Sequence, residues 1–353
     1  MSDLIIKLKG GAGNQLFQAI AGYCFAIKCN KKCKYSIHKI GNNKYKRRLE
    51  ILPLLEFLNF EMYTKTLNNN ILYLDEYDID HPIYWSNNSP LRYLSNDIQI
   101  EGYFTNYRLH NSDILGKIKN FFKNIDFEKN LFMDDYIAIH IRELHGTGIG
   151  KIDKKIENLN INYYIESLNK IMKNVNLSHI KKVVLFSDMW KDKDNSILLP
   201  QIKNLLYERG LKYINGDNEI KSTLELIKVF SFSKACIISN STLSWWGAYL
   251  SKGYIYSPVM NLWEPSLKVP DHWNQVYSNE ITPFTHHKKN YFYTTVTNNP
   301  SNGNKKYSFR RLKLINFIRI CLSNINGIKI IRNFKRFWRE KGILPINKHS
   351  TFN

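Results

Sequence analysis

Long apolar runs are absent from this sequence. No stretch of its 353 residues approaches the roughly 20 consecutive apolar residues that a membrane-spanning helix needs. The N-terminus enters a short apolar run at Leu4 without a basic leader or a cleavage-site pattern, so we expect no secretory signal. The sequence therefore predicts a cytoplasmic protein, with peripheral contact to the inner face of the plasma membrane as a second possibility.

Cysteine is scarce as well. The five cysteines are an odd number and form no C-x-x-C pair, so we interpret them as reduced thiols. Cys24, Cys29 and Cys33 lie close in sequence, but no histidine pair completes a zinc set. The acid pairs Asp134–Asp135 and Asp192 with Asp194 are typical of solvated loops and bind divalent ions poorly. We predict no metal and no cofactor.

Acidic residues are almost missing from residues 305–341. This segment has twelve basic residues and one acid, Glu340, so it carries +11 of the chain's net charge of +21. Its basic residues alternate with Leu, Ile, Phe and Trp, which favours the surface of an anionic membrane. A solvated basic extension is the alternative. A nucleic-acid-binding tail is a further one, but no helix-turn-helix, zinc-finger or RNA-binding signature accompanies it, so we predict no nucleic acid partner.

Elsewhere, short apolar strands alternate with helical patterns. The expected strands are 4–8, 136–141, 182–186, 236–239 and 254–257. One expected helix begins near Asn14, and three more cover 162–172, 219–230 and 243–250. The stretch up to about residue 130 is less regular. This alternation predicts an α/β fold whose parallel sheet binds ligands beyond the carboxyl ends of its strands. After Pro283 the chain becomes polar and leads into the basic tail.

A glycine-rich turn containing Gly11 and Gly13 follows the first expected strand. A dinucleotide fingerprint does not fit, because Leu16 stands at the third glycine position and no acid lies near residues 33–37. A P-loop does not fit either, since no Gly-Lys-Ser/Thr follows. The turn either exposes Asn14 and Gln15 to a facing domain, or uses both amides only to cap the helix.

Polar side chains follow three other strands. His140 and Arg142 share one face of a strand end, and the guanidinium fork of Arg142 suits a diphosphate. Residues 239–244 form a polar turn that opens a helix, where unpaired N–H groups attract anions. Asp188 ends a third strand, in reach of a ribose, a base or a sugar. Each motif also has a plain structural alternative. Arg142 could form an ordinary surface ion pair, and the hydroxyls of the polar turn could only cap the helix. Trp245 and Trp246, which follow the turn, could simply be core residues.

Taken together, these motifs resemble the bacterial α-1,2-fucosyltransferases of glycosyltransferase family 11. Residues 10–18 (GGAGNQLFQ) and 239–248 (SNSTLSWWGA) are the long matches, and shorter ones stand at 101–104, 162–164, 186–188 and 215–217. The resemblance implies a GT-B-like α/β fold with two Rossmann-like domains, whose parallel sheets face a cleft, plus a basic C-terminal tail. We place an acceptor-side domain at 1–130, a nucleotide-sugar-binding domain at 131–285, and the linker and amphipathic tail at 286–353.

The same resemblance implies a metal-independent, inverting transfer. L-fucose would pass from GDP-fucose to the 2-hydroxyl of a galactoside, in a surface glycan or its lipid-linked precursor. The partners are then a nucleotide sugar and a galactose-containing acceptor glycan. Arg142 would hold the donor diphosphate, and Asn14 would lie near the transferred sugar. The residues that we assign to donor binding are His140, Arg142, Asp188, Asn240, Ser241, Thr242, Gly11 and Gly13.

The family motif His-x-Arg-Arg-x-Asp is altered in this chain. Glu143 and His145 stand where the motif has its second arginine and its aspartate. The general base is sought among His145, Glu143 and Asp153, and we favour His145, so that Arg142, His145 and Asn14 form the predicted catalytic set. The change leaves open a transferase for another GDP-linked deoxysugar. Non-catalytic proteins that bind a glycan, a nucleotide or a nucleic acid are the alternatives from another class.

Overall fold

The structure is a computed structural model, and it describes residues 2–37, 40, 48–64, 71–75, 96–105, 110, 112–125, 134–143, 159–188, 196–258 and 269–276. The chain divides into a compact unit of residues 1–287 and a second unit of residues 288–353. All described residues belong to the first unit, so the predicted basic tail lies outside them. None of the described helices is both long and apolar enough to cross a membrane.

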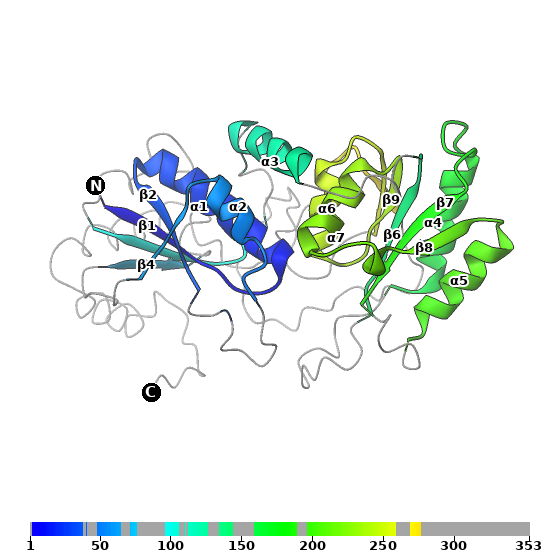
Figure 1. Ribbon diagram of the computed structural model, residues 1–353, viewed down its shortest axis with the longest axis horizontal. Coiled ribbons are helices and arrows are strands. Elements are labelled where there is room, and N and C mark those ends of the chain that lie inside the picture. Colours follow the sequence, from blue (N-terminus) through cyan, green and yellow to red (C-terminus); the bar gives the residue numbers. More distant parts are fainter. Residues whose placement is uncertain are drawn as a thin grey trace, which may run out of the picture. The chain divides into compact units, whose positions relative to one another are not determined.

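A five-stranded sheet forms the first part of this unit. Its strands run in the order β3-β2-β1-β5-β4, and every neighbouring pair is parallel. Helix α1 connects the central strand β1 to β2, and its apolar face is buried (Figure 1). The elements are β1 (Asp3–Lys7), α1 (Ala12–Cys29), β2 (Lys32–Ser36), α2 (Leu52–Phe57), β3 (Glu61–Met62), β4 (Leu72–Asp75), β5 (Ile98–Glu101) and α3 (Ser112–Asn124).

A six-stranded parallel sheet forms the second part. Its spatial order is β11-β10-β9-β6-β7-β8. Counted along the chain from β6, this is the 3-2-1-4-5-6 order of a Rossmann sheet, whose connections diverge between β6 and β9. The elements are β6 (Ile137–Ile141), α4 (Ile161–Lys173), β7 (Lys182–Ser187), α5 (Leu198–Glu208), β8 (Lys212–Asn215), a 3-10 turn (Gly216–Asn218), α6 (Thr223–Phe232), β9 (Ala235–Ile237), α7 (Thr242–Leu250), β10 (Tyr254–Pro258) and β11 (Asn274–Val276).

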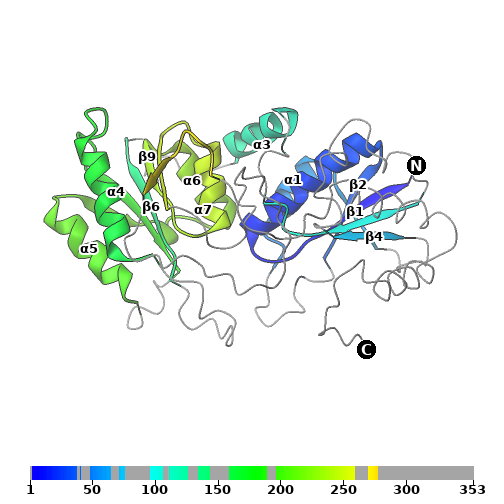
Figure 2. The ribbon, with the colours of Figure 1, turned by 180° about the vertical axis from the view of Figure 1, so that it is seen from behind.

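Helices cover both faces of the second sheet. Both views show α4 and α5 on one face and α6 and α7 on the other (Figures 1 and 2). Because side chains of a strand alternate in direction, Ile137, Ile139 and Ile141 enter the core that α4 and α5 line, while His140 packs its ring edge-on against Phe230 of α6. The alternation along this strand therefore delivers a polar side chain to the α6 side of the sheet.

The expected α/β fold with two parallel sheets, as in a GT-B-like protein, is confirmed. Two details differ. The helix predicted over 219–230 begins at Thr223, because the Ser222 hydroxyl accepts a hydrogen bond from Glu225 N at 3.2 Å and caps the helix there. The stretch before residue 130, for which the sequence predicts less regular chain, contains four short strands and two helices after α1. The domain limits at 130 and 285 remain a prediction.

The starts of α1 and α7 are in direct contact. Trp246 Nε1 donates a hydrogen bond to Gly13 O at 3.1 Å, and the rings of Phe17 and Trp246 lie 4.7 Å apart. A Cβ atom added at Gly13 would stand 2.5 Å from Leu243 N and 2.6 Å from Thr242 Oγ1. Real Cβ atoms do not approach backbone so closely, so Gly13 is needed for this packing.

We expect Gly13→Ala to destabilise the fold by roughly 1–3 kcal/mol, the usual cost of overpacking, because backbone atoms of α7 block the added methyl group. Gly116→Ala is the matched control, since a Cβ at this exposed position in α3 meets nothing within 4 Å. It should stabilise the helix by about 0.5–1 kcal/mol. Urea unfolding of both variants tests this, and equal stabilities would contradict the packing role of Gly13.

Candidate active site

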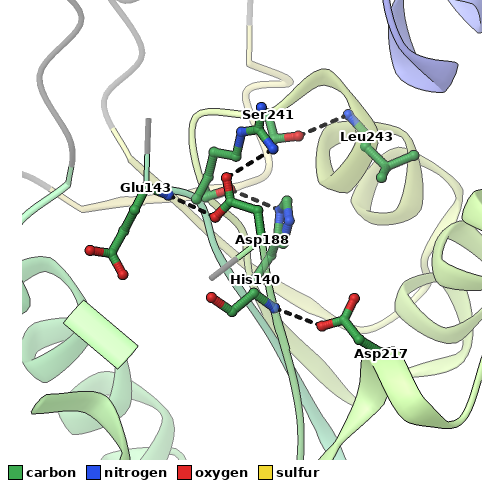
Figure 3. A network of polar contacts seen from close by, with 9 residues as sticks. His140, Glu143, Asp188, Asp217, Ser241 and Leu243 are labelled. Carbon is green, nitrogen blue, oxygen red and sulfur yellow. Dashed lines mark hydrogen bonds and ion pairs between the residues drawn. The ribbon is translucent and has the colours of Figure 1, made fainter. Parts of the chain in front are cut away.

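The ends of β6 and β9 lie side by side at the point where the sheet connections diverge. The two strands pair in parallel with Ile139 opposite Ile237, so the residues that follow each strand reach the same edge. His140 Nδ1 and Ser239 Oγ share a hydrogen bond of 2.8 Å that ties the two ends together (Figure 3). Ligands of such sheets bind at this position.

Arg142 follows β6 and is held by Asp188. Its Nη1 lies 3.0 Å from Asp188 Oδ2, and Glu143 N donates to Asp188 Oδ1 at 3.0 Å. The side chains of Arg142 and Asp188 are 27% and 23% exposed to solvent. Burial raises the pKa of Asp188, and the Arg142 charge and the Glu143 amide oppose that shift. Because a guanidinium carries five N–H donors, this ion pair leaves Arg142 able to bind a further anion.

The next residue, Glu143, turns its carboxylate in the opposite direction. The residue is 1% exposed, and its oxygens accept hydrogen bonds from Ser196 Oγ at 2.5 Å, Ile197 N at 2.9 Å and Leu198 N at 3.2 Å. These donors stand at the start of α5. A carboxylate held in this way is a helix cap rather than a free proton acceptor, so Glu143 is a poor candidate for the general base.

Helix α7 begins directly after β9 with the predicted polar turn. Ser241 is its N-cap, and the serine hydroxyl accepts a hydrogen bond from Leu243 N at 3.3 Å. Asn240 is buried at the preceding position, and Thr242 is the first residue of the helix. Trp245 and Trp246 are fully buried, which confirms that both belong to the core. The positive end of α7 therefore lies at the same sheet edge as Arg142.

Two buried histidines are held in the neutral form. Burial lowers the pKa of His140 to about 3, and the nearby charge of Arg142 acts in the same direction. Burial alone lowers the pKa of His110 to about 3. The His110 ring stacks on Trp246 with 5.3 Å between ring centres. Neither imidazole thus supplies a positive charge near neutral pH.

The glycine-rich turn is shaped by two amide side chains. Gly10 has a φ of 78°, and a Cβ there would stand 2.7 Å from Asn14 Nδ2, so the Asn14 amide packs over this residue. Gln15 is fully buried and joins the turn to another loop: its Nε2 donates to Gly10 O and Arg48 O, and its Oε1 accepts from Glu50 N. Gln15 is therefore a structural link and neither an exposed ligand nor a helix cap.

The structure brings part of the predicted site together. The residues that meet at the ends of β6, β7 and β9 are His140, Arg142, Asp188, Asn240 and Ser241. Gly13 and Thr242 are in contact with each other, while Gly11 is the N-cap residue of α1 without a side-chain bond. His145 and Asp153 lie outside the described residues, so the favoured base stays a prediction. The assignment of all these site residues to donor binding or catalysis also stays a prediction.

Sequence reasoning missed two contacts of this site. One is the attachment of Glu143 to α5. The other is Asp217, whose Oδ2 accepts a hydrogen bond from Ser187 N at 2.9 Å beneath the end of β7 (Figure 3). Only the short match at 215–217 pointed to it. In the described parts of the chain, no three or more His, Cys, Asp or Glu side chains gather as metal ligands do; the predicted independence from metal remains to be measured.

Comparison with known proteins extends these observations. Residues 98–263 match the model of glycosyl transferase family 11. The α-1,2-colitosyltransferase of Escherichia coli is 24% identical over 297 residues, with 71% of this chain and 88% of that protein covered. These matches support glycosyltransferase family 11 as the family of this chain. It is a fucosyltransferase-like glycosyltransferase.

Solved fucosyltransferases have only a distant likeness to this glycosyltransferase. NodZ from Bradyrhizobium has a TM-score of 0.40 at 11% identity, covering 71% of this chain and 93% of that one. POFUT1 in complex with GDP-fucose has a TM-score of 0.39 at 11% identity, covering 71% and 96%.

The neutral histidines predict a loss of stability in acid. Below pH 6.5 the unfolded chain protonates these imidazoles, whereas the folded protein does so only near pH 3. Stability should be complete above pH 6.5 and fall by up to about 1.4 kcal/mol per pH unit per histidine below it. His110→Phe keeps the ring stack without a titrating group, so it should lose roughly 2 kcal/mol less than the wild type between pH 7.5 and 5.0.

Urea unfolding at both pH values measures this difference. His179→Gln is the control, because the His179 side chain is 63% exposed and lies 3.5 Å from Asp135 at the protein surface. It should leave the acid loss as large as in the wild type. An unchanged acid loss in His110→Phe would show that His110 protonates freely in the folded state.

Proposed function

We propose that this glycosyltransferase moves L-fucose from GDP-fucose to the 2-hydroxyl of a galactoside, with inversion at the sugar carbon. The acceptor would be a surface glycan or its lipid-linked precursor. One observation carries the proposal: the guanidinium of Arg142 and the start of α7 lie at neighbouring strand ends, at the divergence point of a Rossmann sheet. The match to the model of glycosyl transferase family 11 supports sugar transfer, and the α-1,2-colitosyltransferase of Escherichia coli supports the linkage.

This pair of groups suits a departing diphosphate. In the proposed step the acceptor hydroxyl oxygen bonds to C1 of the sugar, the bond from C1 to the diphosphate oxygen breaks, and the hydroxyl proton passes to a base. The negative charge that develops on GDP would meet Arg142 and the N–H groups of α7. One such contact is typically worth roughly 10²–10³ in rate. His145 is our proposed base, a role typically worth about 10²–10⁴.

A second donor is favoured by a specific observation. The relative from Escherichia coli is an α-1,2-colitosyltransferase, and colitose is a dideoxy sugar. Glu143 also replaces the second arginine of the motif, so the contacts to the donor differ from the family pattern. Transfer of another GDP-linked deoxysugar by the same residues is therefore the alternative enzyme reaction. A non-catalytic protein that binds glycan, nucleotide or nucleic acid is the alternative from another class.

Arg142→Ala should lower kcat/KM for GDP-fucose by at least about 10²-fold, because it removes a charge from the leaving group. Arg209→Ala is the matched control, since Arg209 donates a hydrogen bond from Nη2 to Asn169 Oδ1 at 2.8 Å and follows α5, away from the carboxyl ends of the strands. It should keep wild-type turnover. Release of GDP with a lactose-type galactoside as acceptor measures both variants. Full turnover in a folded Arg142→Ala protein would remove this residue from the mechanism.

A thermal-shift panel decides the nucleotide. The full chain is heated with GDP, UDP, CDP and dTDP and with their sugars, with and without magnesium. The proposal expects a shift with GDP compounds that does not depend on magnesium. A preference for UDP or dTDP, or a strict need for metal, would contradict it. Tight, salt-sensitive binding to duplex DNA without any nucleotide shift would favour the nucleic-acid-binding alternative.

We further propose a cytoplasmic protein whose segment 305–341 contacts the anionic inner face of the plasma membrane. Each Lys or Arg near such a surface contributes about 1 kcal/mol. The full chain should therefore float with phosphatidylcholine vesicles that contain phosphatidylglycerol, and not with pure phosphatidylcholine. Changing Lys329, Arg332, Lys335 and Arg336 to Glu together should abolish flotation and leave GDP binding intact. Flotation of this variant would show that the membrane contact lies elsewhere.

A further inference from the structure

We propose that Glu143 is a positioning residue that fixes the phosphate-binding arginine, Arg142, through Asp188. The inference rests on the proposed function, since it assumes that Arg142 binds the donor diphosphate. It assigns a role to the position at which this chain departs from the family motif. Three consecutive contacts connect helix α5 to Glu143, Glu143 to Asp188, and Asp188 to Arg142. Figure 3 shows the contact between Glu143 and Asp188.

The first contact anchors Glu143 to α5. The residue that precedes this helix, Ile197, has no side-chain cap to offer, and its own N–H lies 2.9 Å from Glu143 Oε2. Leu198 N and Ser196 Oγ complete the set of donors. The Glu143 carboxylate thus caps a helix that is more than 50 residues later in sequence. The positive end of α5 stabilises the charge of this buried carboxylate.

The second and third contacts pass this anchoring to the arginine. The amide of the anchored residue donates to Asp188 Oδ1, and Asp188 Oδ2 accepts from Arg142 Nη1, both at 3.0 Å. Asp188 therefore has one oxygen on a fixed backbone group and one on the guanidinium. Arg142 is a long side chain with many rotamers, and this second point of attachment restricts them before any ligand arrives.

The direction of the Glu143 side chain excludes another role. Figure 3 shows its carboxylate pointing away from Asp188. Its hydrogen bonds to Ser196, Ile197 and Leu198 place it at the start of the helix that it caps. A glutamate in place of an arginine therefore does not place a negative charge beside Arg142. It also does not place a free carboxylate there that could deprotonate the acceptor. The substitution exchanges one possible phosphate contact for a firmer hold on the remaining arginine.

Isothermal titration with GDP measures this role in the full chain. Glu143→Ala should weaken GDP binding about tenfold, because a misplacement of about 1 Å in a binding group is enough to cause such a loss. Glu143→Gln keeps an acceptor for Ile197 N and Leu198 N and should stay within about threefold of the wild type. In the Arg142→Ala background, Glu143→Ala should cause no further loss. Glu143→Asp, too short to reach both amides, replaces Glu143→Ala should that variant not fold.

Glu225→Ala is the matched control for lost helix capping. The Glu225 carboxylate also stands at a helix start, where its Oε2 accepts from Lys221 N at 2.9 Å, but it caps α6 and has no contact with Arg142 among the described interactions. This variant should lose a similar stability and keep the wild-type affinity for GDP. A purely structural role of Glu143 predicts equal effects of both alanine variants on GDP affinity and would overturn the inference.

Two further outcomes are decisive. If Glu143→Gln keeps GDP affinity but loses turnover as completely as Arg142→Ala, Glu143 is the base and the positioning role is wrong. Additive losses in the double variant would likewise show that Glu143 acts independently of Arg142. A wild-type protein that does not bind GDP overturns the proposed function as well. If the wild-type protein binds GDP and the Glu143→Ala variant binds it equally well, only the positioning role is overturned.

Discussion

The divergence of the chain between β6 and β9 is the constraint on which the candidate site depends. Both strands are parallel neighbours, so the residue after each reaches the same edge, yet their following helices cover opposite faces of the sheet. In the described part of the chain, the helices that follow these two strands therefore leave this edge of the sheet uncovered. Arg142 and Ser241 occupy it as a consequence of topology, and the bond between His140 and Ser239 keeps the two strand ends in register.

How much of this was visible in the sequence depends on the distance between partners. Strand β6 and helix α7 were predictable because their apolar spacing and the Ser241 cap are local signals. Glu143 gives no such signal, since its partners at Ser196 and beyond are more than 50 residues away. The sequence around Gln15 likewise indicates only an amide at a helix start, although its hydrogen bonds to Arg48 and Glu50 span more than 30 residues of the chain.

The early strands were missed for a different physical reason. Strand β2 (Lys32–Ser36) contains three polar residues and is only partly buried, and β3 has two exposed residues. Such short strands form through pairing with their neighbours, β2 with β1 and β3 with β2, and not through their own sequence pattern. The motif around Gly13 was recognisable in the sequence, but the contact between Gly13 and the start of α7 was not. The glycine admits the backbone of α7, which explains why two distant signature segments occur together in one chain.

The exchange at position 143 changes the electrostatics less than the residue types suggest. An arginine replaced by a glutamate would alter the local charge by two units if both side chains faced the donor. The Glu143 charge is instead taken up by three donors at the start of α5. Burial keeps His140 neutral, so it adds no charge in compensation. The proposed leaving group would then rely on a single guanidinium and on the amides of α7. A site whose described residues supply one full positive charge depends strongly on the placement of that charge. The contacts from α5 to Arg142 provide this placement.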